Sequence, residues 1–314
     1  MHNPDALIIG VTSRALFNLE EEHKIFVEKG FKAYRDYQVS HVDEHLEQGV
    51  AFPFISRLLN LNKHFGREVV KVAVISKNSP ETGQRVFNSC RHYELPIQMG
   101  AFTSGQSTIE MLDALDIGLF LSANRETVDE AIALGKPAGL VLQPEHQQSV
   151  EEPIETPLRI AFDFDGVIAD DESERQYQSA GLDGFNRYET EKAHTPHSPG
   201  PLAKLFQQLS DLQKLELELF ADQKSNKYRP AFRIAIITSR GATSGLRLMT
   251  TLRENYGMTA VELYLLDGIS KKPLLEKIRP HIFFDDQYNH LKETSSSVPS
   301  VLIPFGIHKK QIDA

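Results

Sequence analysis

Short apolar segments rich in β-branched residues recur along the whole chain, and this recurrence limits the fold more than any other feature. Each segment is nearly continuous in apolar character, as in strands buried on both faces of a parallel sheet. The segments cover residues 6–11, 70–76, 117–122, 138–142, 158–164, 232–238, 261–266, 281–286 and 300–305. Helical patterns over 81–93, 127–135 and 245–257 lie between them. Alternating strands and helices predict an α/β fold with a doubly wound parallel sheet.

A polar segment with three prolines, residues 143–157, separates two halves of the chain. It has the composition of a linker. We therefore expect an N-terminal α/β module over residues 1–150 and a second module over residues 151–314.

The two halves resemble each other in sequence pattern. VAVISKNSPETG in the first half matches IAIITSRGATSG in the second. The spacing from Ser76 to Ser122 differs by only one residue from the spacing from Thr238 to Asp285. These similarities predict a repeated module, in which case the halves share one strand order. The alternative is that parallel α/β units look alike after any strand–loop–helix patterning.

Two carboxylates follow the segment LRIAF and are separated by one aromatic residue. The alternation of a strand places Asp163 and Asp165 on the same side, where the chain leaves the sheet. The carboxyl ends of strands form the ligand crevice in open α/β sheets. Carboxylates so close repel each other unless a cation lies between them, and Mg²⁺ prefers oxygen ligands. Gly166 then permits a tight turn. A single Asp here is explained equally well as a helix cap or turn residue.

Three further polar groups also follow apolar segments. Thr238 ends IAIIT and Ser239 follows it, where a hydroxyl and backbone N–H groups suit phosphate oxygens. Lys271 follows VELYLL and brings a cation to the same crevice, and Asp285 and Asp286 end HIFF. Each group alone is explained by a cap, a turn or a solvated lysine. Their joint occurrence, in order, favours one phosphate-handling site.

This order of motifs resembles the haloacid dehalogenase-like (HAD-like) hydrolase superfamily. More specifically, the chain resembles the type I cytosolic 5′-nucleotidase family and its bacterial relatives over nearly its whole length. The segments that carry the resemblance are VTSRALFNLEEEH, VISKNSPETG, FLSANRETVDEA, AFDFDGVIADDESE and PHIFFDDQ. It implies a HAD-like Rossmannoid core and a Mg²⁺-dependent hydrolase that converts nucleoside 5′-monophosphates to nucleoside and phosphate.

The resemblance also implies roles for the carboxylates. Asp163 would be the nucleophile that forms an aspartyl-phosphate, and Asp165 would protonate the leaving oxygen and then activate water. Mg²⁺ would be held by Asp163, by the backbone carbonyl of Asp165 and by Asp286. Asp285 would help to orient Lys271.

The same resemblance assigns phosphate binding to Thr238, Ser239 and Lys271. Lys272 competes with Lys271 for this role, and the pattern around KxP favours Lys271. The helical stretch at about 172–230 occupies the place of a cap that closes over the leaving group.

Within the predicted cap, Phe185 and Tyr188 are candidates to stack on a nucleobase. Packing in the core of the cap explains them equally well.

The N-terminal half lacks the catalytic carboxylates. It has Ser76 where the second half has Thr238, and Ser122 and Ala123 where the second half has Asp285 and Asp286. This module is expected to be a degenerate repeat that cannot hold Mg²⁺ in the same way.

Two roles for the N-terminal module stay open. It is a scaffold, or it is an effector site in which Arg14, Lys77 and Arg125 face a phosphate.

Composition limits the partners. The formal net charge of −9 disfavours a polymeric nucleic acid, and no segment is long and apolar enough to span a membrane. A single cysteine, Cys90, and the lack of a signal-peptide pattern favour a cytoplasmic protein. The alternatives to a 5′-nucleotidase are a HAD phosphatase acting on another small phosphoester and a non-catalytic nucleotide-binding protein. The number of subunits stays open, a homo-oligomer included.

Overall fold

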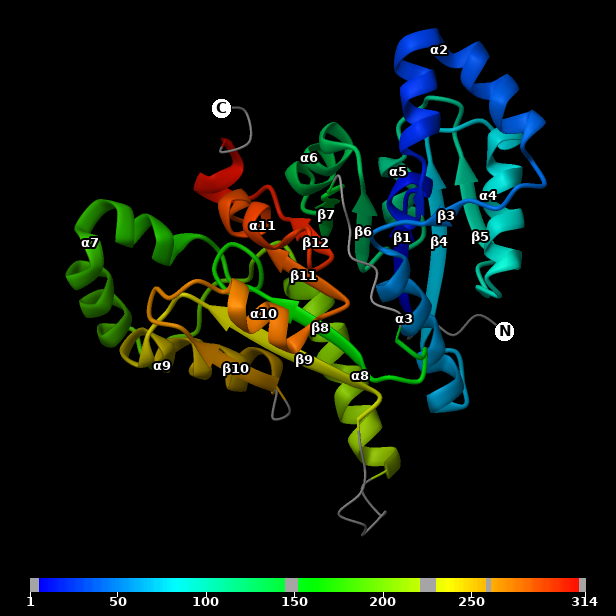
Figure 1. The fold of residues 1–314 in the computed structure, drawn as a ribbon. Helices are drawn as coiled ribbons and strands as arrows, with labels where there is room; N and C mark the ends of the chain where they lie inside the picture. Colours follow the sequence, from blue (N-terminus) through cyan, green and yellow to red (C-terminus); the bar gives the residue numbers. More distant parts are fainter. Residues whose placement is uncertain (1–5, 145–151, 221–229, 258–260, 311–314) are drawn as a thin grey trace. The chain divides into compact units, whose positions relative to one another are not determined.

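The structure is a computed structural model that describes residues 6–144, 152–220, 230–257 and 261–310 (Figure 1). The chain divides into two compact units, Met1–Lys136 and Pro137–Ala314. Strand β7 (Ala138–Val141) belongs to the second unit, where it pairs antiparallel with β12 (Ser300–Leu302). Of the expected linker, residues 145–151 lie outside the described part of the chain.

Over its described residues, the first unit has four parallel strands in the order β6-β1-β4-β5. Most of their apolar side chains are buried. The strands are β1 (Leu7–Val11), β4 (Val70–Ser76), β5 (Met99–Phe102) and β6 (Leu119–Ser122). The helices are α1 (Ser13–Leu16), α2 (Glu20–Ser40), α3 (Phe52–Phe65), α4 (Pro80–His92), α5 (Ile109–Ala114) and α6 (Arg125–Ala133). A short ladder joins β2 (Phe17–Asn18) to β3 (Glu47–Gln48).

In its described ranges, the second unit has six strands in the order β10-β9-β8-β11-β12-β7, and all but β7 are parallel. The strands not yet introduced are β8 (Leu158–Phe162), β9 (Phe232–Thr238), β10 (Val261–Leu265) and β11 (Ile282–Asp285). The helices are α7 (Glu172–Glu191), α8 (Ala203–Phe220), α9 (Ala242–Thr251), α10 (Lys272–Ile278) and α11 (Tyr288–Thr294). A π-helical turn, η1 (Leu252–Tyr256), continues α9, and a 3₁₀ turn, η2 (Gly306–Lys310), follows β12.

This α/β architecture confirms the predicted fold class, and each of the nine apolar segments contains a strand. Strand β5 was missed because its residues, MGAF, include no β-branched side chain. Helices α7 and α8 lie in the stretch expected to be helical, of which residues 221–229 are outside the described chain. No helix in the described ranges has both the length and the apolar character needed to cross a bilayer.

The two units repeat one topology. The order β5-β4-β1-β6 of the first corresponds to β10-β9-β8-β11 of the second. Each unit also has a long kinked helix after the equivalent strand, β1 or β8: α2 bends at Gly30 (φ 78°) and α7 bends at Gly181 (φ 66°). Gly30 lies as far along the chain from Thr12 as Gly181 lies from Asp163. The shared strand order and shared kink support the predicted repetition.

The kinked helices occupy equivalent places in their units. Figure 1 shows the arrows of β4 and β5 pointing toward α2, and the arrow of β9 pointing toward α7. The kink itself requires glycine, since an extended bend at positive φ is strained for other residues. Each unit therefore has a helix over the carboxyl ends of its strands, where ligands bind in such sheets.

Candidate active site

Three buried carboxylates meet at the carboxyl ends of β8 and β11. Asp163 directly follows β8, Asp285 ends β11 and Asp286 is the next residue. The two strands are adjacent, and the backbone N–H of Asp163 donates to the carbonyl of Phe284 at 2.7 Å. The exposed fractions of Asp163, Asp285 and Asp286 are 4%, 0% and 3%. Such burial of charge requires cations close by.

Lys271 supplies one of these cations. Its Nζ lies 2.8 Å from Oδ2 of Asp163 and 2.7 Å from Oδ2 of Asp285. Burial alone would lower the pKa of Lys271, but the charges of the two aspartates raise it instead. Lys272, the competing candidate, is exposed at the start of α10. Only Lys271 therefore reaches the carboxylates.

Asp285 is fully satisfied by the protein. Besides Lys271, it accepts a hydrogen bond at Oδ1 from the backbone N–H of Gln287 at 2.8 Å, and Nδ1 of His290 lies 3.2 Å from Oδ2. Burial opposes its charge, but Lys271 and His290 outweigh burial and bring the pKa of Asp285 down to about 2. His290 was not predicted from the sequence, because only the turn from β11 into α11 brings its ring back to Asp285.

Asp286 differs from Asp285 in its hydrogen bonding. Its Oδ1 is buried and has no hydrogen-bond partner. Burial, followed by the charges of Asp285 and Asp163, raises the pKa of Asp286 well above the usual value. Its other oxygen faces the turn after β8, where a Cβ on Gly166 (φ 70°) would lie 2.2 Å from it. Gly166 therefore allows Asp286 to approach the turn that holds Asp163 and Asp165.

Burial, opposed by Lys271, also raises the pKa of Asp163 to about 6. One oxygen of Asp163 accepts the backbone N–H of Phe164 at 2.7 Å, and the other contacts Lys271. The site thus lacks enough positive charge for its carboxylates, of which Asp286 has the unused oxygen. Oxygen donors with an excess of negative charge fit a hard divalent cation.

A second candidate set of metal ligands consists of Asp163, Asp285 and His290, whose donor atoms lie within 4.8 Å of one another. Lys271 already binds the two carboxylates of this group. Because an ammonium ion occupies the common point, we favour Asp286 over Asp285 and His290 as the metal ligand.

Asp165 lies two residues after Asp163 and is held by Arg240, which follows β9. The Nε and Nη2 atoms of Arg240 donate to the two carboxylate oxygens of Asp165 at 2.8 and 2.7 Å. The pair is bidentate, the geometry in which guanidinium and carboxylate bind best. This ion pair was not predicted from the sequence.

The two hydroxyl residues at the end of β9 differ in exposure. Thr238 is buried, and its Oγ1 accepts the backbone N–H of Arg240 at 3.3 Å. Ser239 is exposed. Thr238 ends the strand next to β8, so both residues lie at the same edge of the sheet as Asp163.

The aromatic residues of α7 have protein partners. Phe185 is buried, with its ring 5.3 Å from the guanidinium carbon of Arg240 and 6.2 Å from the ring of Tyr177. Tyr188 is half-buried and donates its hydroxyl to Glu172. These contacts agree with packing of the helix, and stacking on a nucleobase stays a prediction.

The corresponding edge of the first unit has hydroxyls in place of carboxylates. Ser13 and Ser76 lie 3.3 Å apart through their hydroxyl oxygens. Of the basic residues considered for an effector site, Arg14 pairs with Glu20 and Arg125 pairs with Asp129.

Lys77, the third of these basic residues, is exposed. An effector role for this edge stays a prediction.

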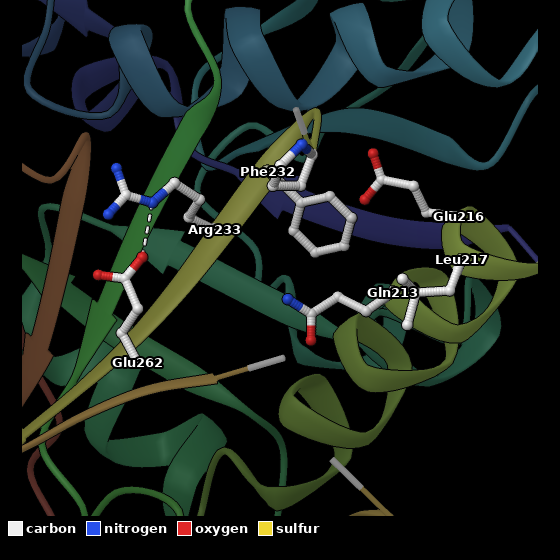
Figure 2. A pocket seen from close by; sticks show the side chains of 7 residues that line it. Gln213, Glu216, Leu217, Phe232, Arg233 and Glu262 are labelled. Atoms are coloured by element: carbon white, nitrogen blue, oxygen red, sulfur yellow. Dashed lines mark hydrogen bonds and ion pairs between the residues drawn. The ribbon is translucent and has the colours of Figure 1, made fainter. Parts of the chain in front are cut away.

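A shallow pocket in the second unit lies elsewhere. Figure 2 shows it between α8 and the start of β9, with Phe232 and Gln213 at its wall and an ion pair between Arg233 and Glu262. Phe232 begins β9, whereas the carboxylates follow the opposite ends of the strands. This pocket is therefore separate from the carboxylate cluster.

Comparison with known proteins identifies a family and a relative. The model of the family described as 5′-nucleotidase matches residues 1–310. Human cytosolic 5′-nucleotidase 1B is 33% identical over 313 residues, which is 98% of this chain and 50% of that protein. The chain thus spans about half the length of this curated relative. No solved structure matches the chain significantly.

Proposed function

Because the chain belongs to the 5′-nucleotidase family, we propose that it is a Mg²⁺-dependent phosphoric monoester hydrolase that converts nucleoside 5′-monophosphates to nucleoside and phosphate. The observation that supports this most is the buried cluster of Asp163, Asp286 and Lys271 at the carboxyl ends of adjacent strands. It combines a nucleophile, an unused carboxylate oxygen and a cation.

In the first step, a carboxylate oxygen of Asp163 attacks phosphorus. A bond forms between this oxygen and phosphorus, and the bond from phosphorus to the 5′ oxygen of the ribose breaks. Asp165 gives its proton to the leaving oxygen, so that the nucleoside departs as a neutral alcohol.

In the second step, Asp165 accepts a proton from a water molecule. The water oxygen bonds to phosphorus while the bond between phosphorus and Asp163 breaks. Inorganic phosphate leaves, and both side chains return to their starting states. One residue thus acts as acid and then as base, as microscopic reversibility requires.

Asp163, the backbone carbonyl of Asp165 and Asp286 would hold Mg²⁺, which when bound offsets the repulsion between an anionic nucleophile and an anionic phosphate. Lys271 contributes a second positive charge to the phosphate oxygens, and Asp285 keeps its ammonium group in place.

Thr238 and Ser239 suit the remaining phosphate oxygens, through the hydroxyls and the backbone N–H groups at the end of β9. These positions are supported by the edge of the sheet that Thr238 shares with Asp163.

The parts around the site complete the proposal. Residues 151–314 form the catalytic module, with α7 and α8 as a cap, and residues 1–150 form a repeated module without catalytic carboxylates. Phe185 or Tyr188 contacts the base of the bound nucleotide. Substitution of each ring by leucine, with KM measured for several bases, tests this contact.

The proposed location is the cytoplasm. The relative's name describes a cytosolic protein, and fractionation of cells that express this chain checks the location.

The proposed function is tested by phosphate release from a panel of phosphomonoesters. The panel holds ribo- and deoxyribonucleoside monophosphates and sugar phosphates, each with Mg²⁺ and with EDTA. We expect Mg²⁺-dependent release from nucleotides and none from Asp163→Asn. Equal rates on sugar phosphates would instead favour a broad HAD phosphatase, and an inactive wild type with Mg²⁺ would favour a nucleotide-binding protein.

A further inference from the structure

We infer that Arg240 is a positioning residue that links helix α7 to Asp165 and fixes the carboxylate that protonates the leaving oxygen. The inference rests on the proposed function, because the role of Asp165 belongs to it. Arg240 itself touches neither phosphate nor the leaving group in this account.

The contacts of Arg240 connect two parts of the second unit. Its Nε and Nη2 hold both oxygens of Asp165, and its Nη1 donates to Glu189 of α7 and to the carbonyl of Ser244 at 3.0 Å. The side chains of Arg240 and Glu189 are 3% and 0% exposed. A buried guanidinium held on two sides leaves Asp165 little freedom to rotate.

Arg240 is surrounded by acceptors within the protein. Four of the five N–H groups of its guanidinium donate to oxygen atoms of Asp165, Glu189 and Ser244. Nε2 of His197 lies 3.1 Å from Nη2 of Arg240 and 3.2 Å from the carboxylate of Glu189. Because these donors are engaged within the protein, Arg240 is placed to orient Asp165 rather than to bind substrate phosphate.

The first unit, which lacks the catalytic carboxylates, indicates which arginine contacts belong to the fold rather than to the reaction. Arg247 of α9 donates to Glu189 at 3.1 Å, and Arg85 of α4 donates to Gln38 of α2 at 2.9 Å. Arg85 lies as far from Ser76 as Arg247 lies from Thr238. An arginine that ties the kinked helix to the helix after β4 or β9 is therefore present with and without the catalytic carboxylates.

Among the residues that the structure describes, the first unit has no counterpart of the Arg240–Asp165 pair. By the same spacing, Asn78 stands at the place of Arg240 and Arg14 at the place of Asp165. Asn78 donates instead to the hydroxyl of Ser13 at 3.3 Å. The pair occurs only in the unit that has the nucleophile, which assigns Arg240 to the reaction and Arg247 to the fold.

The side chain of Arg240 thereby couples the position of α7 to Asp165, the proposed catalytic acid. Glu189 lies in the part of α7 that follows the Gly181 kink. The rings of Phe164 and Phe185 lie 5.4 and 5.3 Å from the guanidinium carbon of Arg240 and keep water from it. A shift of this part of α7 would therefore move Asp165.

The experiment compares two leaving groups. Ribose 5′-oxygen needs a proton to leave, whereas nitrophenolate is a weak base and leaves without one. The rate of the first turnover with Mg²⁺ is measured by rapid quench for a nucleoside monophosphate and for nitrophenyl phosphate. The variants are Arg240→Lys and, as the matched control, Arg247→Lys, which also contacts Glu189 but not Asp165. Thermal unfolding of each variant checks that it is folded.

We expect Arg240→Lys to slow the first turnover of the nucleotide about 10- to 100-fold and that of nitrophenyl phosphate by less than about 3-fold. Arg247→Lys should change both rates by the same factor. Equal loss on both substrates in Arg240→Lys, or the same leaving-group dependence in Arg247→Lys, would overturn the inference.

A second variant keeps the test decisive if Arg240→Lys does not fold. Glu189→Gln weakens the hold on Arg240 without removing it, and a smaller loss confined to the nucleotide is expected. Equal effects on both substrates would count against the inference. A wild type that hydrolyses neither substrate would contradict the proposed function instead, so the two failures are distinguishable.

Discussion

Replacement of Asp286 by asparagine is predicted to stabilise the protein without metal and to destabilise it, relative to wild type, with metal. Asparagine keeps the shape of the side chain and removes a charge. In the structure this charge is buried, its Oδ1 has no partner, and Asp163 and Asp285 lie close enough to oppose it.

The size of the effect follows from these contacts. Two like charges about 4 Å apart at an effective dielectric constant of about 20 repel by roughly 4 kcal/mol. Lys271 offsets much of this repulsion, and proton uptake by the carboxylates limits it further. We therefore expect Asp286→Asn to raise the free energy of unfolding by about 1–2 kcal/mol in EDTA.

Mg²⁺ should reverse the order of stability of the wild type and Asp286→Asn. A cation that binds only the folded state adds about 2.7 kcal/mol at 100 times its dissociation constant. The wild type should gain this amount and the variant should not. The assay is urea unfolding followed by circular dichroism at pH 8, with EDTA and with Mg²⁺.

Asp285→Asn is the matched control, because Asp285 already has three protein partners. The free energy of unfolding of Asp285→Asn should be about 3–5 kcal/mol lower than that of the wild type in both buffers, as expected when a buried ion pair is broken. An Asp286→Asn protein that is less stable than wild type in EDTA would refute the reasoning.

Three further predictions concern the turn, the cation and the cap. Gly166→Ala should lower stability by about 1–3 kcal/mol and abolish phosphate release, because its Cβ would strike Asp286 at positive φ; urea unfolding and a phosphate assay check this, and a fully active variant would contradict it. Lys271→Met should lower phosphate release about 100-fold or more while Lys272→Met does not, as measured by kcat/KM; equal losses would contradict the assignment. Burial opposes the charge of Glu172, but hydrogen bonds to its side chain outweigh burial and lower its pKa from 4.5 to about 2. Glu172 should therefore contribute about 1–2 kcal/mol to the free energy of unfolding above pH 4.5, and this contribution should be lost toward pH 2. Glu172→Gln should remove this part of the acid dependence of urea unfolding.

The sequence was informative wherever function lies at the end of a strand. Apolar segments located β8, β9 and β11, and the residues just after them had to share one edge of a parallel sheet. The closeness of Asp163 to Lys271 and of Asp286 to Gly166 follows from that rule. The weakest strand pattern, β5, was missed because its side chains lack β-branching.

The network around Arg240 was not predictable in this way. Arg240 lies 75 residues from Asp165 and 51 from Glu189, and no periodicity joins them. Their contact depends on the kink in α7, which turns the second part of the helix toward β9. Comparison of the two units makes this network interpretable, because the first unit keeps Arg85 but not the pair.

The central claim is that Asp163, Asp165 and Asp286 converge on one divalent cation. Calorimetric titration of Mg²⁺ into the metal-free wild type, Asp286→Asn and Asp285→Asn tests it most directly. We expect one Mg²⁺ per wild-type chain, and at least a 10-fold weaker affinity in Asp286→Asn than in Asp285→Asn. Unchanged Mg²⁺ affinity in Asp286→Asn would contradict the claim.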